Sequence, residues 1–493
     1  MSALPVELYT AGQVRELDRI AIEERGIPSI TLMERAGGSA FEVLTRRYAG
    51  ARNLVVVCGG GNNAGDGYVL ARLAKQAGLA VRVIALVEPA RLKGDAAASA
   101  QKFLDTGPVE NTLSLDGTDL IVDALLGSGL SRQVEGIFAE TIELVNTSAV
   151  PVMALDIPSG LNADTGVCMG TAVRADATLT FIGLKRGLFT AQGPDFCGEV
   201  LFSDLETPAD IHAAVATDAR LVEPAQVMRN LPPRPRHAHK GSYGHVLVIG
   251  GDYGYLGAAI LAGCAAARTG AGLVTVATRE EYARNLPLFR PELMTVAVAS
   301  AQDLDTILDK VGVVAIGPGL GQSDWAMSLF AKVLQTRLPL VVDADALNLL
   351  ALEHQRRENW VLTPHPGEAA RLLGVATRDI QADRFAAVAS LRDKFDGVIV
   401  LKGAGSLVMD AGGPVYVNRT GNPGMASGGM GDVLTGMIAG LLAQGIGPGM
   451  AAVAGVHLHG HAADLCAGQG ERGMLAGDIL PAIRSVVNPD QCG

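Results

Sequence analysis

The chain has 493 residues, more than one ordinary hydrophobic core can organise, so two or three domains are expected. Hydrophobic residues make up 48%, aromatic residues only 4%, and glycine occurs 61 times, which is typical of α/β domains with many tight turns. The net charge of -11 argues against a nucleic-acid or anionic-membrane partner, because both surfaces repel an acidic protein.

The cysteine pattern and the terminal segments indicate the cellular compartment in which the protein is expected. Six cysteines are scattered without a Cys-x-x-Cys pair, which indicates reduced thiols and no structural zinc site. The N-terminal residues lack the basic-then-apolar pattern of a signal peptide, and Gly, Pro and His interrupt the apolar stretches near the C-terminus. We therefore expect a cytoplasmic protein with no membrane partner.

The first half of the chain predicts two helices followed by a parallel sheet. Thr10 and Gln13 have the spacing of a capping box, and apolar residues follow at helical spacing as far as Gly26. A second helix is expected over residues 31–48, and short apolar runs predict strands at 54–58, 81–87, 120–122, 152–155 and 178–182. Because the runs are apolar on both faces and alternate with helical segments, the sheet should be parallel and covered on both sides.

Polar side chains follow three of these strands. Asn63 lies after the first strand, Asp123 after the third, and Asp156 and Ser159 after the fourth. Ligands bind at the carboxyl edge of parallel sheets, so these side chains should converge there. A carboxylate that ends a buried strand needs a partner, and oxygens from Asn63, Asp123 and Ser159 suit an alkali or alkaline-earth ion. The alternative for each residue alone is a turn residue at a strand end.

The second half predicts a different α/β domain. The pattern weakens from residue 205, and residues 231–240 form a proline-rich, basic connector. We place the boundary before this connector, with one domain over residues 1–215 and the other over residues 225–493. Strands are predicted at 245–249, 273–277, 294–298, 313–316, 340–342 and 398–401, with helices at about 256–270 and 430–444.

The glycine-rich stretch at residues 421–436 predicts a phosphate site. Glycines let backbone N–H groups approach a ligand closely, and the start of the following helix attracts anions. Asp432 at that helix start would repel an anion, so it fits better as a base for a hydroxyl beside the phosphate. The alternative is that Asp432 only caps the helix.

Other glycine-rich turns and a histidine cluster carry weaker signals. The glycine triplet at 317–321 is not a dinucleotide fingerprint, and the chain has no P-loop. The turn at 402–406 follows a strand, so its backbone and Lys402 could hold adenylate phosphates. His457, His459 and His461 look like metal ligands, but helical spacing points His459 away from the other two, which favours packed or surface histidines.

Together these motifs resemble a known family. Residues 61–67, 123–127, 155–162 and 180–187 resemble NAD(P)H-hydrate epimerase, and residues 239–244, 317–321, 343–348, 363–368 and 421–436 resemble ADP-dependent NAD(P)H-hydrate dehydratase. The order is that of the bifunctional repair enzymes, and the resemblance spans nearly the whole chain. It implies an α/β protein in which an N-terminal Rossmann-like parallel-sheet domain is fused to a C-terminal ribokinase-like α/β domain.

For the epimerase domain, the resemblance implies a potassium ion bound by Asn63, Asp123 and Ser159, with Asp156 as the acid/base. The family more often has glycine at the position of Ala64, so a positive φ there would weaken binding. The implied hydrate-binding residues are Asn62, Asn63, Ala64, Gly65, Asp66, Gly127, Ser128, Gly129, Leu130, Ser131, Arg132, Gln133 and Asp156.

For the dehydratase domain, the resemblance implies ADP as co-substrate, a magnesium ion and Asp432 as the base. Phosphorylating the hydrate's hydroxyl turns a poor leaving group into phosphate and leaves AMP. The epimerase then lets a dehydratase specific for the S form clear both epimers. The implied hydrate-binding residues are Ala258, Gly319, His365 and Asp432, and the implied nucleotide-binding residues are Lys402, Gly403, Ala404, Gly405, Ser406 and Gly431.

Two other functions stay open from the residues alone. A ribokinase-type small-molecule kinase with an accessory N-terminal domain would use the same glycine-rich turn and aspartate. A non-catalytic nucleotide-sensing or scaffold protein would need neither Asp156 nor Asp432. In each case we expect small-molecule ligands and a homo-oligomer, and the choice of ADP over ATP rests on the resemblance only.

Overall fold

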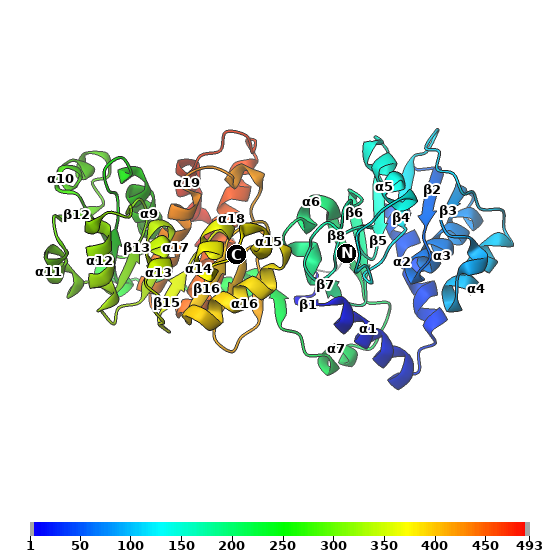
Figure 1. Ribbon diagram of the computed structural model, residues 1–493, viewed down its shortest axis with the longest axis horizontal. Coiled ribbons are helices and arrows are strands. Elements are labelled where there is room, and N and C mark those ends of the chain that lie inside the picture. The colour runs from blue at the N-terminus through cyan, green and yellow to red at the C-terminus, as the bar shows by residue number, and fades with distance from the viewer. Residues whose placement is uncertain (1–3, 489–493) are drawn as a thin grey trace. The chain divides into compact units, whose positions relative to one another are not determined.

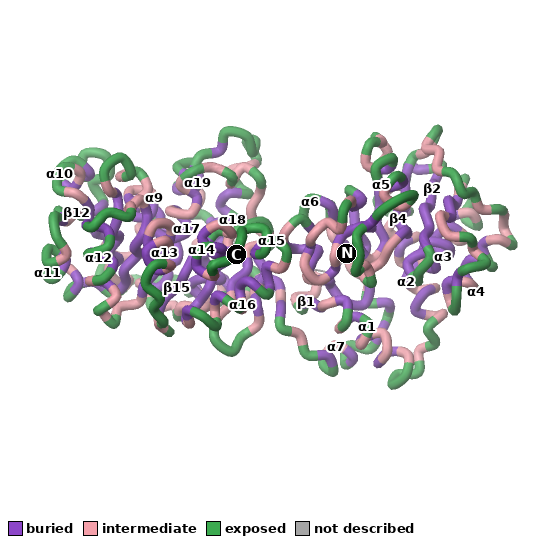
Figure 2. Tube along the Cα trace, in the orientation of Figure 1, coloured by how far each residue is buried: buried purple, intermediate pink, exposed green. Residues whose placement is uncertain are grey.

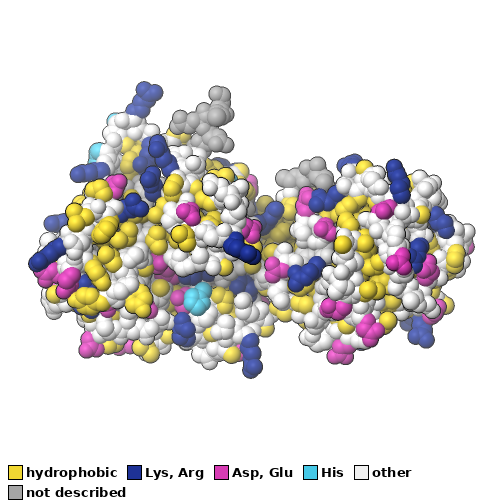
Figure 3. All heavy atoms as spheres, turned by 90° about the horizontal axis from the view of Figure 1, so that it is seen from above, with side chains coloured by type: hydrophobic (Ala, Val, Ile, Leu, Met, Phe, Trp, Pro, Cys, Tyr) yellow, Lys and Arg dark blue, Asp and Glu magenta, His cyan; other side chains and the backbone are white. Residues whose placement is uncertain are grey.

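The computed structural model describes residues 4–488, which form two compact α/β units that divide between Arg220 and Leu221 (Figure 1). Over the described range, no helix has both the length and the apolar character needed to cross a membrane. Lys and Arg side chains are interspersed with Asp and Glu side chains on the face shown in Figure 3, so the charge of that face is mixed.

The first unit is built on a parallel sheet with the strand order β3-β2-β4-β5-β6-β8. Its strands are β1 (Glu7–Tyr9), β2 (Asn53–Cys58), β3 (Ala80–Ala85), β4 (Leu120–Ala124), β5 (Val152–Leu155), β6 (Ala177–Phe181), β7 (Leu184–Lys185), β8 (Glu199–Ser203) and β9 (Ala219–Leu221). Its helices are α1 (Ala11–Arg19), α2 (Ser29–Arg47), α3 (Asn62–Gln76), α4 (Gly94–Leu104), α5 (Ile137–Thr147), α6 (Gly193–Cys197) and α7 (Asp210–Ala214).

Both faces of this sheet are covered, as the continuous apolar runs predicted. Along β2, Leu54 and Val56 pack in the cluster that contains α2 and α3, whereas Val55 and Val57 pack in the cluster that contains α5. Strands β4, β5 and β6 are buried at every position, and the central strands of both units are drawn as buried in Figure 2. Side chains at the ends of these strands are therefore held on a rigid frame.

Short strands fix the N-terminal helix to the sheet region. Strand β1 pairs in parallel with β7, with Tyr9 opposite Lys185, and antiparallel with β9. Thr10 then caps α1 in the predicted capping box with Gln13, and a π-helix over Ile20–Glu24 continues it. The start of α1 is thus set beside Lys185.

The second unit has a sheet in the order β12-β11-β10-β13-β14-β15-β16-β17-β18, parallel as far as β16 and antiparallel beyond it. Its strands are β10 (His245–Ile249), β11 (Leu273–Thr278), β12 (Met294–Ala297), β13 (Val313–Ile316), β14 (Leu340–Val342), β15 (Trp360–Leu362), β16 (Val398–Leu401), β17 (Leu407–Met409) and β18 (Val415–Val417). Its helices are α8 (Pro224–Arg229), α9 (Leu256–Thr269), α10 (Glu280–Phe289), α11 (Asp305–Leu308), α12 (Asp324–Leu334), α13 (Ala344–Leu352), α14 (Pro366–Leu373), α15 (Thr377–Ala382), α16 (Arg384–Phe395), α17 (Met430–Ala443), α18 (Pro448–Ala467) and α19 (Ala476–Val486).

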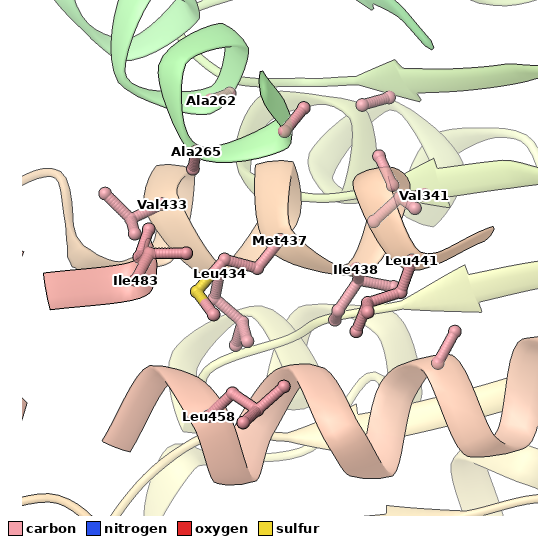
Figure 4. Close-up of a cluster of buried hydrophobic side chains, with 14 of the residues drawn as sticks. Ala262, Ala265, Val341, Val433, Leu434, Met437, Ile438, Leu441, Leu458 and Ile483 are labelled. Carbon is pink, nitrogen blue, oxygen red and sulfur yellow. The ribbon is translucent and has the colours of Figure 1, made fainter. Parts of the chain in front are cut away.

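Helix α17 is the centre of the second unit's core. Its residues Val433, Leu434 and Met437 lie among side chains of α9, α18 and α19, and almost every residue of the helix is buried (Figure 4). Gly436 faces α9 so closely that a Cβ there would lie 2.0 Å from the Ala262 carbonyl oxygen. This packing holds the N-terminal turn of α17, with Asp432, in a defined place.

All the predicted strands were found, and those at 152–155, 245–249, 313–316, 340–342 and 398–401 have the predicted bounds. The strand expected at 81–87 was too long, because β3 ends at Ala85. Strand β8, at the edge of the sheet, was missed: its apolar run is only three residues long and Leu201 is its one buried residue. Strands β15, β17 and β18, of three residues each, were also missed.

Candidate functional site

The first unit encloses a cavity of about 750 Å³ at the carboxyl edge of its sheet. Most of the predicted hydrate-binding residues line this cavity, whereas Ala64, Gly65 and Gln133 do not. The residues of that prediction that do line it are Asn62, Asn63, Asp66, Gly127, Ser128, Gly129, Leu130, Ser131, Arg132 and Asp156.

The three residues expected to bind a cation lie close together. Ser159 donates from its Oγ to Asp123 Oδ1 at 2.6 Å and from its N–H to Asp123 Oδ2 at 2.8 Å. Asn63 donates from Nδ2 to the Leu126 carbonyl, but its buried Oδ1 accepts no hydrogen bond from residues 4–488. Burial raises the pKa of Asp123 to about 6. A buried, unsatisfied oxygen beside a buried carboxylate fits a cation held by oxygen ligands.

Asp156 lies in a strained turn after β5. Its φ of 66° is in the left-handed region, which only glycine, asparagine and aspartate adopt readily. The buried Lys185 ammonium donates to Asp156, to Thr180 Oγ1 at 3.0 Å and to the Phe181 carbonyl at 2.9 Å. The Ser128 N–H, which also lines the cavity, donates to Asp156 Oδ2 at 3.3 Å. This carboxylate is therefore aimed into the cavity and held by a fixed positive charge.

Two further carboxylates share this cavity. Burial, followed by the charges of Asp156 and Asp18, raises the pKa of Asp66 well above its usual value. Burial also raises the pKa of Asp18, on α1, to about 6. Sequence reasoning missed Asp18, which lies inside a helix and not after a strand, and it gave Lys185 no role.

Residues 62–66, which the resemblance places at the hydrate, are helical. They form the first turns of α3, which begins at Asn62. Ala64 is helical and fully buried, and it is absent from the positions with positive φ. The condition under which Ala64 would weaken binding therefore does not arise at this position.

In the second unit, Asp432 lies in the first turn of α17. The helix cap is Gly429, with φ of 91°, so the alternative in which Asp432 only caps the helix is wrong. Burial, followed by the charge of Asp343, raises the pKa of Asp432 to about 7. A carboxylate with that pKa takes up and releases protons near neutral pH, as a general base must.

A buried ion pair supports this turn. Lys402, after β16, donates to Asp343 Oδ1 at 2.7 Å and lies 3.8 Å from Glu368 Oε2. Asp343 also accepts hydrogen bonds at 2.8 Å from Thr363 and from Thr435 of α17. Burial raises the pKa of Glu368 to about 7. Lys402 thus contacts Asp343 at the start of α13 and Glu368 of α14, and Asp343 connects it with α17.

The turn at 402–406 adjoins α17. Gly403 and Gly405 have positive φ, and Ser406 Oγ donates to the Gly403 carbonyl at 2.9 Å. A Cβ on Gly431 would lie 3.2 Å from Lys402 Nζ, so Gly431 is in contact with the end of Lys402. The structure therefore brings Lys402, Gly431 and Asp432 together, with Gly403, Ala404, Gly405 and Ser406 in the adjoining turn.

The other predicted hydrate-binding residues fall in two places. His365 caps α14 by accepting from the Gly367 N–H at 2.9 Å, and its Nε2 lies 3.5 Å from Glu368 Oε1, so Glu368 connects it with Lys402. A Cβ on Gly319 would lie 3.3 Å from Ala258 Cβ, so these two adjoin each other. Helix α9, which carries Ala258, also lies against Gly429 through Leu261.

The histidine segment of α18 packs inside the second unit. His457 and His459 are buried and His461 is exposed, and the rings of His457 and His461 lie 6.2 Å apart. The predicted sharing of a face by His457 and His461 is confirmed by this contact. Among residues 4–488, no cluster of three His, Cys, Asp or Glu side chains forms a metal site.

Comparison with known proteins assigns the family. Residues 29–187 match the model of the YjeF-related protein N-terminus, and residues 246–485 match that of NAD(P)H-hydrate dehydratase. A bifunctional NAD(P)H-hydrate repair enzyme from Coxiella burnetii is 52% identical over 98% of this chain and 99% of its own length. The chain belongs to the family of bifunctional NAD(P)H-hydrate repair enzymes. The counterpart from Escherichia coli is 43% identical over 99% of this chain and 95% of its own length.

A solved structure supports a ribokinase-like fold for the second unit of this repair-enzyme chain. A ribokinase-like superfamily protein from Enterococcus faecalis is 31% identical, with a TM-score of 0.51 over 55% of this chain and 95% of that one. The expected α/β class, with a ribokinase-like second half, is therefore confirmed. The Rossmann-like first half agrees with the parallel sheet of the first unit.

Proposed function

We propose that this chain repairs hydrated NADH and NADPH. The first unit interconverts the R and S hydrates, and the second unit dehydrates the S form with ADP, which releases NAD(P)H, AMP and phosphate. Each unit holds a carboxylate at its candidate site, Asp156 in the first and Asp432 in the second, and the chain matches repair enzymes along almost its whole length. This combination supports the proposal.

In the first unit, the hydrate would bind in the cavity against residues 62–66 and 127–133, with Asp156 as the acid/base. A potassium ion would be held by oxygens of Asn63, Asp123 and Ser159, and it would supply the positive charge that the buried Asp123 carboxylate lacks. Because the reacting hydroxyl is on the carbon next to the ring nitrogen, its reversible loss needs only acid/base help.

In the second unit, Asp432 would deprotonate the hydroxyl of the S hydrate while the phosphoryl group of ADP transfers to it. The N–H groups at the start of α17 and the glycines before it would stabilise the transferring group. The nucleotide would bind to Lys402, Gly403, Ala404, Gly405, Ser406 and Gly431, and the hydrate to Ala258, Gly319, His365 and Asp432.

A magnesium ion would accompany the nucleotide in this unit. Magnesium is held by phosphate oxygens with one or two carboxylates, and Glu368 is a carboxylate of that kind beside Lys402. Bound there, the ion would lower the negative charge of the phosphates.

The purified chain tests the proposal when it is mixed with hydrated NADH, ADP, potassium and magnesium. We expect the absorbance of reduced nicotinamide to return, with AMP and phosphate released together. A phosphorylated product that accumulates without losing phosphate would instead identify a ribokinase-type kinase. A wild type that binds nucleotide without turning over the hydrate, with nucleotide binding unchanged in both Asp156→Asn and Asp432→Asn, would identify a non-catalytic protein.

We also propose a cytoplasmic location and a homo-oligomer. The cysteines within residues 4–488 are all free thiols, as in a reducing compartment. Leu288 and Phe289, at the end of α10, are 80% and 66% exposed and offer an apolar contact to a second copy. Sedimentation of the wild type and Phe289→Asp tests this contact, and a monomeric wild type would contradict it.

A further inference from the structure

Helix α1 contributes a carboxylate to the cavity of the first unit. Val14, Asp18 and Ile22 follow one another at intervals of four residues, and all three line the cavity. Residues spaced by four lie on one face of a helix, so this face of α1 and its π-helical extension forms a wall of the site. Asp18 is the charged residue in the middle of that face.

The position of α1 is fixed by close packing. Its first turn follows β1, in which Tyr9 pairs with Lys185. A Cβ on Gly183 would lie 3.0 Å from side-chain atoms of both Tyr9 and Leu17, so the helix lies directly on the turn before Lys185. The Ala11 N–H also donates to Asp164 Oδ1 at 2.6 Å. Asp18, next to Leu17, is therefore held on the same side of the unit as Lys185 and Asp156.

The charges around Asp18 differ from those around Asp156. Lys185 is bonded to Asp156, whereas none of the described residues forms a hydrogen bond or an ion pair with the Asp18 carboxylate. The other charged groups that line the cavity are Lys185, Asp156, Asp66, Arg15, Asp95 and Arg132, and the charges of Lys185 and Asp156 act on Asp18. Burial raises the pKa of Asp18 to about 6, with Lys185 opposing and Asp156 adding to this shift. Asp18 thus keeps a proton more readily than an ordinary aspartate.

We propose that Asp18 is a second catalytic residue of the epimerase site and acts as the general acid that complements Asp156. The proposal rests on the epimerase activity proposed above. Asp18 gives its proton to the departing hydroxyl while the bond between carbon and oxygen breaks, so water leaves and the ring nitrogen takes the positive charge as an iminium. Water then adds to the other face of that carbon and gives its proton to Asp156. Solvent returns a proton from Asp156 to Asp18, and nothing is consumed.

Two carboxylates are useful because epimerisation inverts the configuration of the carbon that carries the hydroxyl. One group must protonate the oxygen that leaves and another must accept a proton from the water that adds, and the roles exchange in the reverse direction. Asp156, bonded to an ammonium, fits the acceptor, and Asp18, without a partner, fits the donor. A single carboxylate would have to serve both faces of the ring.

The test compares Asp18→Asn with the wild type in the full chain. Epimerisation is followed from the pure R hydrate, above the rate without protein, and dehydration of the S hydrate is followed separately. We expect kcat for epimerisation to fall about 100-fold in Asp18→Asn, with KM changed little and dehydration unchanged. Glu16→Gln, whose carboxylate pairs with Arg19 on the outer part of α1, is the matched control and should epimerise at the wild-type rate.

The pH profile separates catalysis from a structural effect. Because the acid must carry its proton, the wild-type rate should fall as the pH rises above about 6, and Asp18→Asn should lose this dependence. Asp18→Glu should restore part of both the rate and the dependence. The proposal for Asp18 is contradicted if Asp18→Asn keeps the wild-type kcat, or if only its KM rises and the pH dependence is unchanged. Either result leaves the proposed epimerase function untouched. A wild type that does not epimerise overturns the proposed function as well.

Discussion

Lys402 Nζ lies 2.7 Å from Asp343 Oδ1, and the two residues follow strands β16 and β14, on either side of β15. Asp343 is 1% exposed, and it also accepts hydrogen bonds from Thr363 and Thr435. The pair therefore ties the turn that carries Lys402 to the first half of α17. Because Asp343 is buried and the Lys402 side chain is only 19% exposed, neither charge is readily replaced without its partner.

Removal of the Asp343 charge should destabilise the second unit. In Asp343→Asn, Lys402 is left as a buried cation without its main partner, which costs about 3–5 kcal/mol. Both tryptophans of the chain, Trp325 and Trp360, lie in the second unit, so their fluorescence in urea reports on this unit alone. Asp305→Asn, which removes the exposed pair with Lys332, is the control and should cost less than about 1 kcal/mol.

The same pair predicts how stability depends on pH. Burial would raise the pKa of Asp343, but Lys402 holds it below its usual value. A lowered pKa stabilises the folded state above the pKa of the unfolded chain, and this stabilisation is lost as the pH falls through the folded value. Wild-type stability should therefore fall more steeply in acid than that of Asp343→Asn. Parallel curves for the two proteins would contradict the assignment.

Asp432→Asn should abolish dehydration and leave epimerisation intact. The base is removed while the size of the side chain is kept, so we expect a loss of about 100- to 10,000-fold in turnover with ADP. In the wild type, the dehydration rate should increase as the pH rises through about 7, where Asp432 loses its proton. A residual rate in Asp432→Asn with the same pH dependence would show that another group is the base.

Asn63→Ala should remove the response of epimerisation to potassium. The variant loses the buried Oδ1 that has no hydrogen-bond donor among residues 4–488. The measurements are epimerisation and thermal unfolding of the first unit in potassium chloride and in sodium chloride, since a bound ion stabilises the folded state. Asn111→Ala, on an exposed loop, should behave as the wild type. An unchanged potassium response in Asn63→Ala would remove Asn63 from the cation site.

Gly436→Ala should separate α17 from α9. The added Cβ would overlap the Ala262 carbonyl, so we expect a loss of about 1–3 kcal/mol in the second unit and slower dehydration. Gly477→Ala in α19 is the control, because its Cβ would meet nothing within 4 Å. That variant should be unchanged or slightly more stable, since alanine favours a helix. Equal stability of both variants would contradict the close contact.

The strands and the residues that follow them were predicted better from the sequence than the side chains that other elements contribute to the sites. Asp123 and Ser159 were expected to meet because both follow strands of one parallel sheet, and they do. Asp18 could not be found in this way, since it reaches the cavity through the pairing of β1 with β7 and the packing of α1 on Gly183. Such long-range contacts leave no periodic pattern in the sequence. The pairings of Lys185 with Asp156 and of Lys402 with Asp343 were not foreseen for the same reason, although both lysines lie in the motifs.

The left-handed backbone at Asp156 has a consequence for genetic variation. Single-base changes of an aspartate codon yield both asparagine and glycine, and these are the residues that accept this backbone most easily. Either residue would keep the backbone but leave the buried Lys185 ammonium without its carboxylate, so these variants should lose stability as well as activity. A screen for lost epimerase activity should therefore recover them at reduced abundance.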